Sequence, residues 1–149
     1  MKSKATLFPK NLQQIHENFS KQIVMLRNEV LEKQYNKRRP MLQEKYEFSA
    51  GEYIIIVPEH AADLVEEGKK MHNCVGGYMR SFAEGETDIM FIRRAKDPDV
   101  VLGTMEVKDG RIVQARAEHN RKLPEDVNDF VELFRMEKLE KKKRARKTA

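Results

Sequence analysis

The chain has 149 residues, of which 40% are apolar and 36% charged, and a formal net charge of +5. This length predicts one domain that buries a real hydrophobic core. A single cysteine excludes an internal disulfide, and no stretch approaches the roughly 18 apolar residues that a membrane span requires. Because the first residues also lack the apolar run of a signal peptide, we expect a soluble cytoplasmic protein.

The first predicted element is a long amphipathic helix. Its apolar positions recur at three- and four-residue steps, at Leu12, Ile15, Phe19, Ile23, Leu26 and Val30. This spacing predicts a helix of about six or seven turns that begins near Pro9, and Pro40 should end or kink it near Arg39. We assign residues 1–137 to one domain, with a helical arm at about 9–46 and a body at about 47–137.

A basic cluster lies late in this arm, at Lys33, Lys37, Arg38 and Arg39. One interpretation is a patch that binds nucleic-acid phosphates. The other is a solvated helix face, which is the more common origin of such a charge run.

The body begins with an uninterrupted β-branched and aromatic run, Tyr53 to Val57, which predicts a strand covered on both faces. A helix is expected from about Glu59 to Lys70. The stretch from Met71 to Tyr78, with the sequence MHNCVGGY, comes next and contains the only cysteine. Its two adjacent glycines permit close backbone approaches that a side chain would block. His72 and Cys74 should therefore lie at a junction with a second short helix, from Tyr78 to Phe82.

Three further strands are expected, at residues 88–94, 100–108 and 111–118. Asp109-Gly110, between the last two, is the preferred loop of a two-residue hairpin. This loop sets a register in which Met105 lies opposite Gln114, Gly103 lies opposite Arg116, and Glu106 occupies the other face. Each face then mixes apolar and polar side chains. One polar set should be partly buried, and partly buried charge needs a partner.

The last helix should run from about Pro124 through Phe134 into a basic tail at residues 138–149. Residues 135–149 hold eight basic and two acidic residues, so this segment has a net charge of +6 and the rest of the chain −1. Such a tail adds sequence-independent attraction to nucleic acid; the alternative is a solvated helix end whose cations suit the helix dipole. The candidate phosphate ligands are Lys141, Lys142, Lys143, Arg144, Arg146 and Lys147.

Together these elements predict an α+β fold. A small, mostly antiparallel sheet of three or four strands should be flanked by helices. The long N-terminal and C-terminal helices should pack near one another or onto one face of the sheet.

We expect a functional cleft between the MHNCVGGY stretch and the hairpin. The candidate catalytic residues are His72, Cys74, Tyr78 and Glu106, and the candidate substrate ligands are Arg93, Gln114, Arg116 and Asn120. In an enzyme, Cys74 would be the nucleophile, with His72, His16 or His119 as base and Glu106 or Asn73 as orienter.

Two alternatives to thiol catalysis stay open at this site. In a nucleotide-handling site, Tyr78 would stack on a base, beside Glu106 as the carboxylate. In a purely structural role, Cys74 would be buried, as free cysteines usually are, and His72 would tie two helices together. A structural zinc ion usually has four ligands with paired cysteines, which this chain cannot supply. We therefore expect no metal and no cofactor.

The ordered succession of these segments resembles the conserved C-terminal region of PcfJ-like proteins. The resemblance rests on FPKNL at 8–12 with His16, YII at 53–55, LVEEGK at 64–69, HNCVGGY at 72–78, FIRR at 91–94, TMEV at 104–107, and IVQAR at 112–116 with Asn120. It spans about Pro9 to Phe134. Family members often carry a longer N-terminal region, and often a Cys and a Gly where this chain has Ala115 and Ala117, which disfavours a mechanism that needs a second thiol.

The resemblance implies a protein of a mobile genetic element, encoded by a phage or a plasmid. Two functions then compete. The first is an accessory protein that binds nucleic acid or a host nucleic-acid-associated machine, as an inhibitor of host defence or as a conjugation factor. No recognised DNA- or RNA-binding signature supports sequence-specific readout. The second is an enzyme that uses the His72/Cys74 site on a nucleotide or nucleic-acid substrate.

Overall fold

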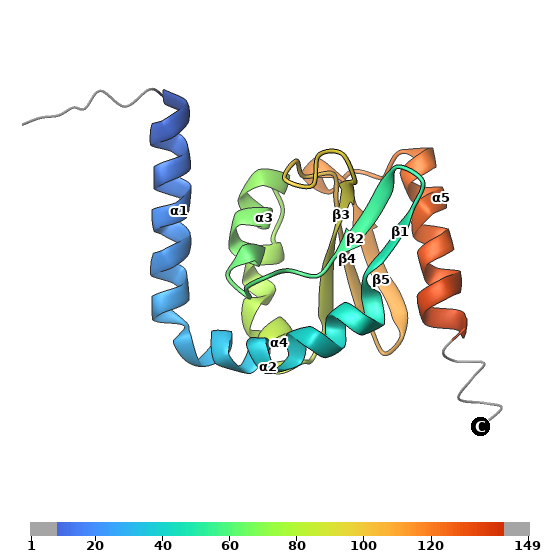
Figure 1. The fold of residues 1–149 in the computed structure, drawn as a ribbon, viewed down its shortest axis with the longest axis horizontal. Helices are drawn as coiled ribbons and strands as arrows, with labels where there is room; N and C mark the ends of the chain where they lie inside the picture. Colours follow the sequence, from blue (N-terminus) through green and yellow to red (C-terminus); the bar gives the residue numbers. More distant parts are fainter. Residues whose placement is uncertain (1–8, 142–149) are drawn as a thin grey trace, which may run out of the picture.

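A five-stranded antiparallel sheet forms the centre of the computed structural model, which describes residues 9–141 (Figure 1). The strands lie in chain order: β1 (Phe48–Ala50), β2 (Tyr53–Ile56), β3 (Asp88–Arg94), β4 (Gly103–Lys108) and β5 (Arg111–Arg116). The α+β class is confirmed, but the expected three or four strands become five. The additional strand is β1, which has three residues and is too short to show an alternating pattern.

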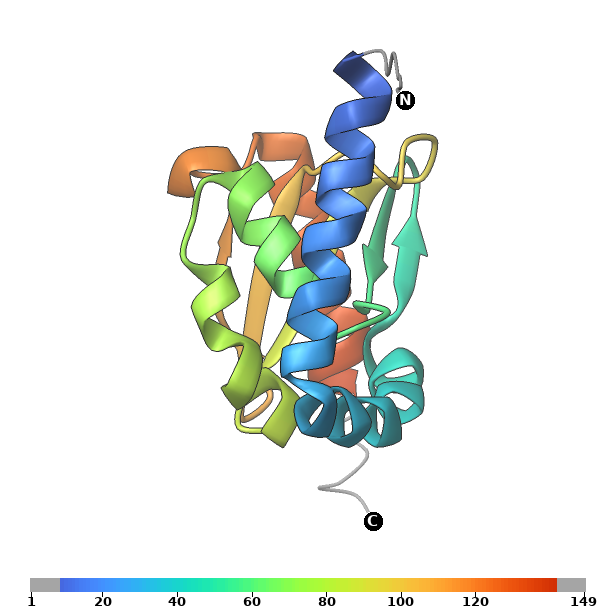
Figure 2. The same cartoon turned by 90° about the vertical axis from the view of Figure 1, so that its left-hand side faces the viewer.

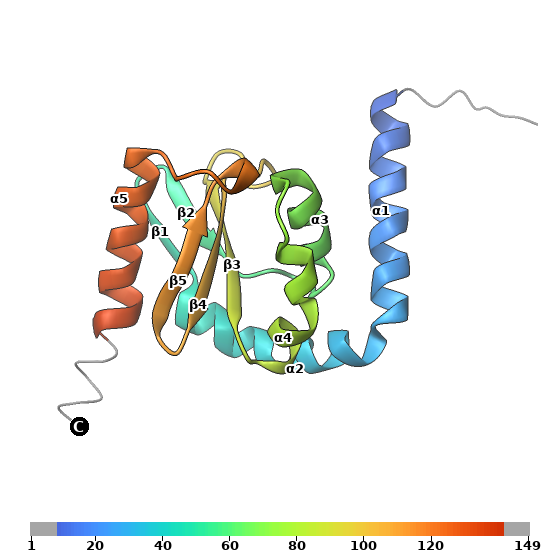
Figure 3. The ribbon, with the colours of Figure 1, turned by 180° about the vertical axis from the view of Figure 1, so that it is seen from behind.

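Helices cover both faces of this sheet (Figure 3). On one side lie α3 (Asp63–Met71), the 3-10 turn η1 (Val75–Tyr78) and α4 (Met79–Glu84). On the other side lies α5 (Glu125–Phe134), followed by the π-helical segment η3 (Arg135–Glu140). The α5 face packs through aromatic rings, since Phe130 stacks on Phe48 at 5.7 Å and contacts Tyr53 at 5.6 Å between ring centroids. Burial of these rings fixes α5 on the β1–β2 half of the sheet.

The helical arm consists of two helices rather than one. α1 (Pro9–Arg27) ends before Asn28, and α2 (Glu29–Tyr46) leaves in a sharply different direction (Figure 1). The bend lies at Asn28, whose side-chain amide donates to the Val24 carbonyl at 2.8 Å, and asparagine commonly competes for backbone bonds in this way. The predicted stop at Pro40 is wrong, because Pro40 lies inside α2 with its ring exposed.

Burial explains why α2 continues through its proline. Tyr35, Leu42 and Tyr46 are almost completely buried and lie on both sides of Pro40. Each large buried side chain contributes about 1.5–3 kcal/mol, which together exceeds the roughly 3 kcal/mol that an internal proline costs. Tertiary packing therefore overrides the local signal.

The placement of the terminal helices differs from the prediction. α1 lies outside α3, and α5 lies on the opposite side of the sheet (Figures 1 and 2). Polar contacts hold the arm at this position: Lys21 pairs with Asp63 at 2.6 Å and Lys70 with Glu17 at 3.8 Å. The expectation that the long terminal helices pack together is wrong, because the bend at Asn28 directs α1 away from the sheet.

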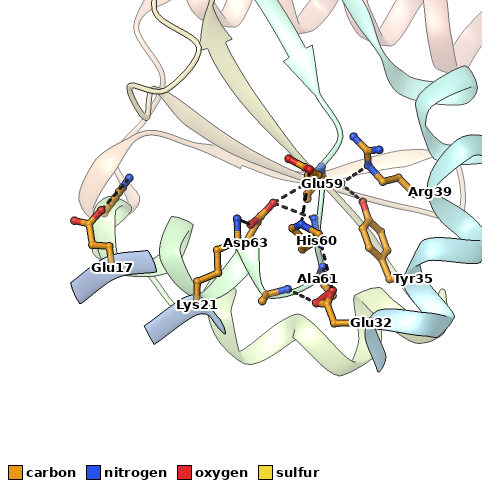
Figure 4. A network of polar contacts seen from close by, with 12 residues as sticks. Glu17, Lys21, Glu32, Tyr35, Arg39, Glu59, His60, Ala61 and Asp63 are labelled. Atoms are coloured by element: carbon orange, nitrogen blue, oxygen red, sulfur yellow. Dashed lines mark hydrogen bonds and ion pairs between the residues drawn. The ribbon is translucent and has the colours of Figure 1, made fainter. Parts of the chain in front are cut away.

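A polar network joins α2 to the segment that enters α3 (Figure 4). The buried Glu32 carboxylate accepts hydrogen bonds from the Ala61 and Ala62 amides at 3.2 and 2.7 Å. The Tyr35 hydroxyl and the Arg39 guanidinium donate to the Pro58 carbonyl at 2.5 and 3.0 Å. These bonds satisfy backbone groups that α3 and the preceding loop leave free.

Alkaline pH should destabilise the protein through two buried tyrosines. Burial raises the pKa of Tyr35 above its ordinary value, and burial with a hydrogen bond to Asp88 does the same for Tyr46. Above about pH 10 the unfolded chain therefore releases these protons first, so their stabilisation is complete below that pH and is lost as the pH rises. We expect absorbance at 295 nm to show that both phenols ionise only as the protein unfolds. Ionisation of all tyrosines before unfolding would contradict this.

No helix within residues 9–141 is both long and apolar enough to cross a membrane.

Candidate functional site

An open pocket of about 330 Å³ lies between the segment joining α3 to α4 and the sheet face formed by β3, β4 and β5. Three segments far apart in the sequence contribute polar side chains to it. The pocket is lined by His72, Asn73, Cys74, Val75, Tyr78, Ile89, Thr104, Glu106, Gln114, Arg116 and Asn120. The structure thus brings together all the candidate catalytic residues and candidate substrate ligands of the predicted cleft except Arg93.

The first wall of the pocket begins where α3 ends. His72 adopts the left-handed conformation (φ 52°) and terminates the helix, and the amides of His72 and Asn73 both donate to the Gly68 carbonyl. The Asn73 side chain then accepts a hydrogen bond from the Val75 amide at 3.0 Å, which is a local turn typical of asparagine. These bonds turn the chain so that His72, Cys74 and Tyr78 line the pocket.

Glycines make this turn compact. A Cβ atom on Gly68 would lie 3.1 Å from the Gly76 amide nitrogen, and one on Gly76 would lie 3.3 Å from the Val65 Cα. Gly77, in contrast, has open space around the position of a Cβ atom. The close approach expected of the glycine pair is therefore made by Gly76 with Gly68 on α3.

The second wall depends on a bulge in the hairpin. Lys108 pairs with Arg111 and Val107 with Ile112, but Val113 is then skipped, so that Glu106 pairs with Gln114 and Thr104 with Arg116. The predicted pairing of Met105 with Gln114 is wrong by one residue. An extra residue in one strand shifts every later side chain to the other face. Glu106, Gln114 and Arg116 consequently share the pocket face.

Glu106 is a fixed acceptor at the pocket wall. One carboxylate oxygen accepts a hydrogen bond from the Thr87 hydroxyl at 2.7 Å, and the other accepts one from the Gln114 amide at 3.4 Å. Because one oxygen is bound by the residue that precedes β3 and the other by a residue of β5, the carboxylate has a defined orientation. This agrees with the expectation that partly buried charge in the hairpin has a partner.

A buried ion pair between Glu67 and Arg93 lies behind the pocket. The site residues predicted from the sequence do not include Glu67, and they place Arg93 among the substrate ligands. Glu67 on α3 binds the Arg93 guanidinium through two hydrogen bonds, and Thr104, which lines the pocket, donates to Glu67 at 2.9 Å. Arg93 also donates to the Pro98 carbonyl at 3.1 Å and is 5% exposed. The prediction of Arg93 as a substrate ligand is therefore not supported. The missed signal is that Glu67 shares a helix face with the apolar Leu64 and Met71.

Cys74 is exposed in this pocket, so the structural alternative of a buried cysteine is wrong. Within residues 9–141, no hydrogen bond joins its thiol to an imidazole. The His72 ring instead stacks on the His119 ring, with centroids 4.4 Å apart and planes 4° from parallel. His16, the third candidate base, is exposed on α1 and does not line the pocket.

The residues that could hold a metal ion lie beside the pocket. Ligand atoms of His72, Glu118 and His119 lie within 4.8 Å of one another, and all three residues are exposed. Because the two imidazole planes are nearly parallel, their lone pairs do not converge on one point, and an ion could bind both only after a ring turned. His119, one of the candidate bases, lies in η2 (Glu118–Asn120), which brings it back to His72.

The predicted basic patch on the arm is only partly available to a ligand. Arg38 donates to the Phe82 carbonyl and pairs with Asp88 at 2.8 Å, and Arg39 is bound to the Pro58 carbonyl. Lys33 and Lys37 are exposed. At the C-terminal end Lys141 pairs with Glu137 at 2.7 Å. The remaining tail candidates, Lys142, Lys143, Arg144, Arg146 and Lys147, lie outside the described residues.

The fold and the pocket define an α+β protein with a polar, open pocket on a face of an antiparallel sheet. The chain belongs to the PcfJ-like protein family, whose model matches residues 1–131. It is 37% identical over 129 residues to an uncharacterized protein of Listeria innocua, and the aligned region covers 85% of this chain and 28% of that relative. No solved structure matches the chain.

Proposed function

We propose that the pocket binds a nucleotide, either free or as an exposed nucleotide of a nucleic-acid strand. The observation that carries this proposal is the convergence of an aromatic, a cationic and an anionic side chain, Tyr78, Arg116 and Glu106, around one opening. A volume of about 330 Å³ lies at the small end of ligand sites, which suits one nucleotide rather than a larger molecule.

Each side chain has a role that follows from its chemistry. Tyr78 is 39% exposed at the pocket, where its ring can stack on a base. Arg116 is exposed and presents a guanidinium, the group that best matches phosphate geometry. Glu106, held by Thr87 and Gln114, accepts hydrogen bonds from a base edge or a ribose hydroxyl.

Arg116 should contribute strongly to binding. A hydrogen bond to a charged group is worth about 1.5–3 kcal/mol, so we expect Arg116→Ala to weaken nucleotide binding about 10- to 150-fold. Calorimetry against mononucleotides and short single-stranded DNA and RNA tests this. Arg111→Ala is the matched control, because Arg111 is exposed on the same strand but does not line the pocket. Equal affinities of the two variants, or no binding by the parent protein, would reject the proposal.

A thiol-dependent enzyme is a second candidate, and the exposure of Cys74 in the pocket favours it. We expect iodoacetamide to alkylate Cys74 in the folded protein, because the sulfur is accessible, and a bound nucleotide to slow that alkylation at least threefold. Mass spectrometry of the modified chain measures both. Labelling that occurs only after denaturation would exclude Cys74 as a nucleophile, and unchanged labelling with saturating nucleotide would place the ligand elsewhere.

The setting of this activity is also a proposal. We infer a mobile-element accessory protein, of a phage or a plasmid, that acts on nucleic acid or on a host nucleic-acid-associated machine, including as an inhibitor of host defence. Family membership and the basic C-terminal sequence support this inference. Recovery of the tagged protein from its host, with RNA, DNA and protein all analysed, would identify the partner.

A truncation that tests the role of the basic tail must begin after Lys141, because Leu139 is buried.

A further inference from the structure

Helix α1 is amphipathic, but the side that faces the body of the protein is mainly polar. Its ion pairs with α3 come from Glu17 and Lys21, which bind Lys70 and Asp63. Nearer the end of α1, Val24 and Met25 are partly buried against the core. At about 100° per residue, the apolar stripe lies on the opposite side of α1. Leu12, Ile15, Phe19 and Leu26 on that stripe are 54%, 51%, 60% and 73% exposed, and Ile23 is partly buried.

The residues on this exposed side of α1 indicate which kind of partner can bind it. From Asn11 to Met25 the only charged residues are Glu17 and Lys21, and both point towards α3. Helices that bind anionic membranes or nucleic acid carry lysine and arginine beside the apolar stripe, whereas from Asn11 to Met25 this stripe is flanked by uncharged residues such as His16 and Gln22. Another apolar helix is therefore the complementary surface.

The order of the apolar residues identifies that helix. Leu12, Ile15, Phe19, Ile23 and Leu26 are separated by steps of three, four, four and three residues, so the pattern reads the same in both directions around Phe19. When two copies of α1 lie antiparallel, Phe19 meets Phe19 of the second copy, Ile15 meets Ile23, and Leu12 meets Leu26. A two-fold axis requires this self-complementarity of an interface between identical chains.

We propose that α1 forms an antiparallel pair with α1 of a second copy of this chain, with the two-fold axis at Phe19. Covering the stripe on both copies removes on the order of 1,000 Å² of surface. This area is typical of a weak, concentration-dependent dimer. The interface lies on the side of α1 that faces away from α3, so the nucleotide pocket stays open in both copies.

Chemical cross-linking tests both the contact and its direction. In a Cys74→Ser background, a short bis-maleimide should link Phe19→Cys chains to one another. Leu12→Cys and Leu26→Cys should each link poorly alone, but a mixture of the two should give a hetero-dimer at least fivefold more abundantly. Gln14→Cys is the control, because Gln14 is exposed on α1 away from the stripe.

Solution mass gives an independent readout. Sedimentation equilibrium should show a dimer whose dissociation constant rises at least tenfold in Phe19→Glu and stays unchanged in Gln14→Glu, with the same helix content by circular dichroism. Self-linking of Leu12→Cys would show parallel pairing and overturn the proposed register. A monomer at all concentrations, or equal masses of Phe19→Glu and the parent, would overturn the proposal.

Discussion

Replacing Glu67 by alanine is expected to lower the free energy of unfolding by about 3–5 kcal/mol, the usual cost of removing one member of a buried ion pair. The Glu67 and Arg93 side chains are 2% and 7% exposed, and two hydrogen bonds join them. Without Glu67 the guanidinium stays buried with its charge uncompensated. Thr104 also loses its acceptor, and the pocket wall loses its support from behind. Urea denaturation followed by circular dichroism measures the change.

Two further variants distinguish the loss of the buried charge pair from the loss of side-chain packing in Glu67→Ala. Arg94→Ala, at an exposed neighbour of Arg93, should change stability by less than about 0.5 kcal/mol. The double variant Glu67→Leu/Arg93→Met should be more stable than Glu67→Ala or Arg93→Ala, because apolar replacement of both partners leaves no buried charge. A loss below about 1 kcal/mol in Glu67→Ala would mean that water reaches the pair and that the site is not closed behind the pocket.

Replacing Gly68 by valine is expected to cost about 1–3 kcal/mol, the usual range for overpacking, and to disturb the pocket that we propose binds a nucleotide. The new Cβ atom would lie 3.1 Å from the Gly76 amide nitrogen and 3.3 Å from the Asn73 carbonyl oxygen. Both are backbone atoms, which cannot rotate away as the end of a side chain can. The turn that carries His72 and Cys74 must therefore move away from α3. Thermal unfolding and nucleotide calorimetry measure the two effects.

Gly77→Ala is the matched control for this turn. Gly77 lies next to Gly76, but no heavy atom lies within 4 Å of the position that its Cβ atom would occupy, so we expect stability and binding close to those of the parent. The difference between the two variants isolates the close approach from any general effect of losing a glycine. Equal behaviour of both variants would show that the α3 contact does not position the site.

Local patterns were sufficient for most elements of the body. The run from Tyr53 to Val57 predicted β2, and Asp109-Gly110 predicted the β4–β5 hairpin with its first pair, Lys108 and Arg111. These features depend on side chains a few residues apart, so their signal is contained in a short window. The polar residues gathered around the pocket were also named from the sequence, because mixed strand faces and a lone His-Asn-Cys segment are unusual for a plain core.

The sequence by itself determined the order of helices and strands in the body after β1, the hairpin loop and the candidate pocket residues. Only the tertiary structure decided the bend at Asn28, the bulge at Val113 that puts Gln114 and Arg116 beside Glu106, the return of His119 to His72, and the burial of Arg93. The physical reason is that these features depend on how the elements pack against one another in the folded chain. The free energy gained by burying many side chains exceeds local preferences, such as the cost of Pro40 inside α2. That burial cannot be read from a short window of sequence.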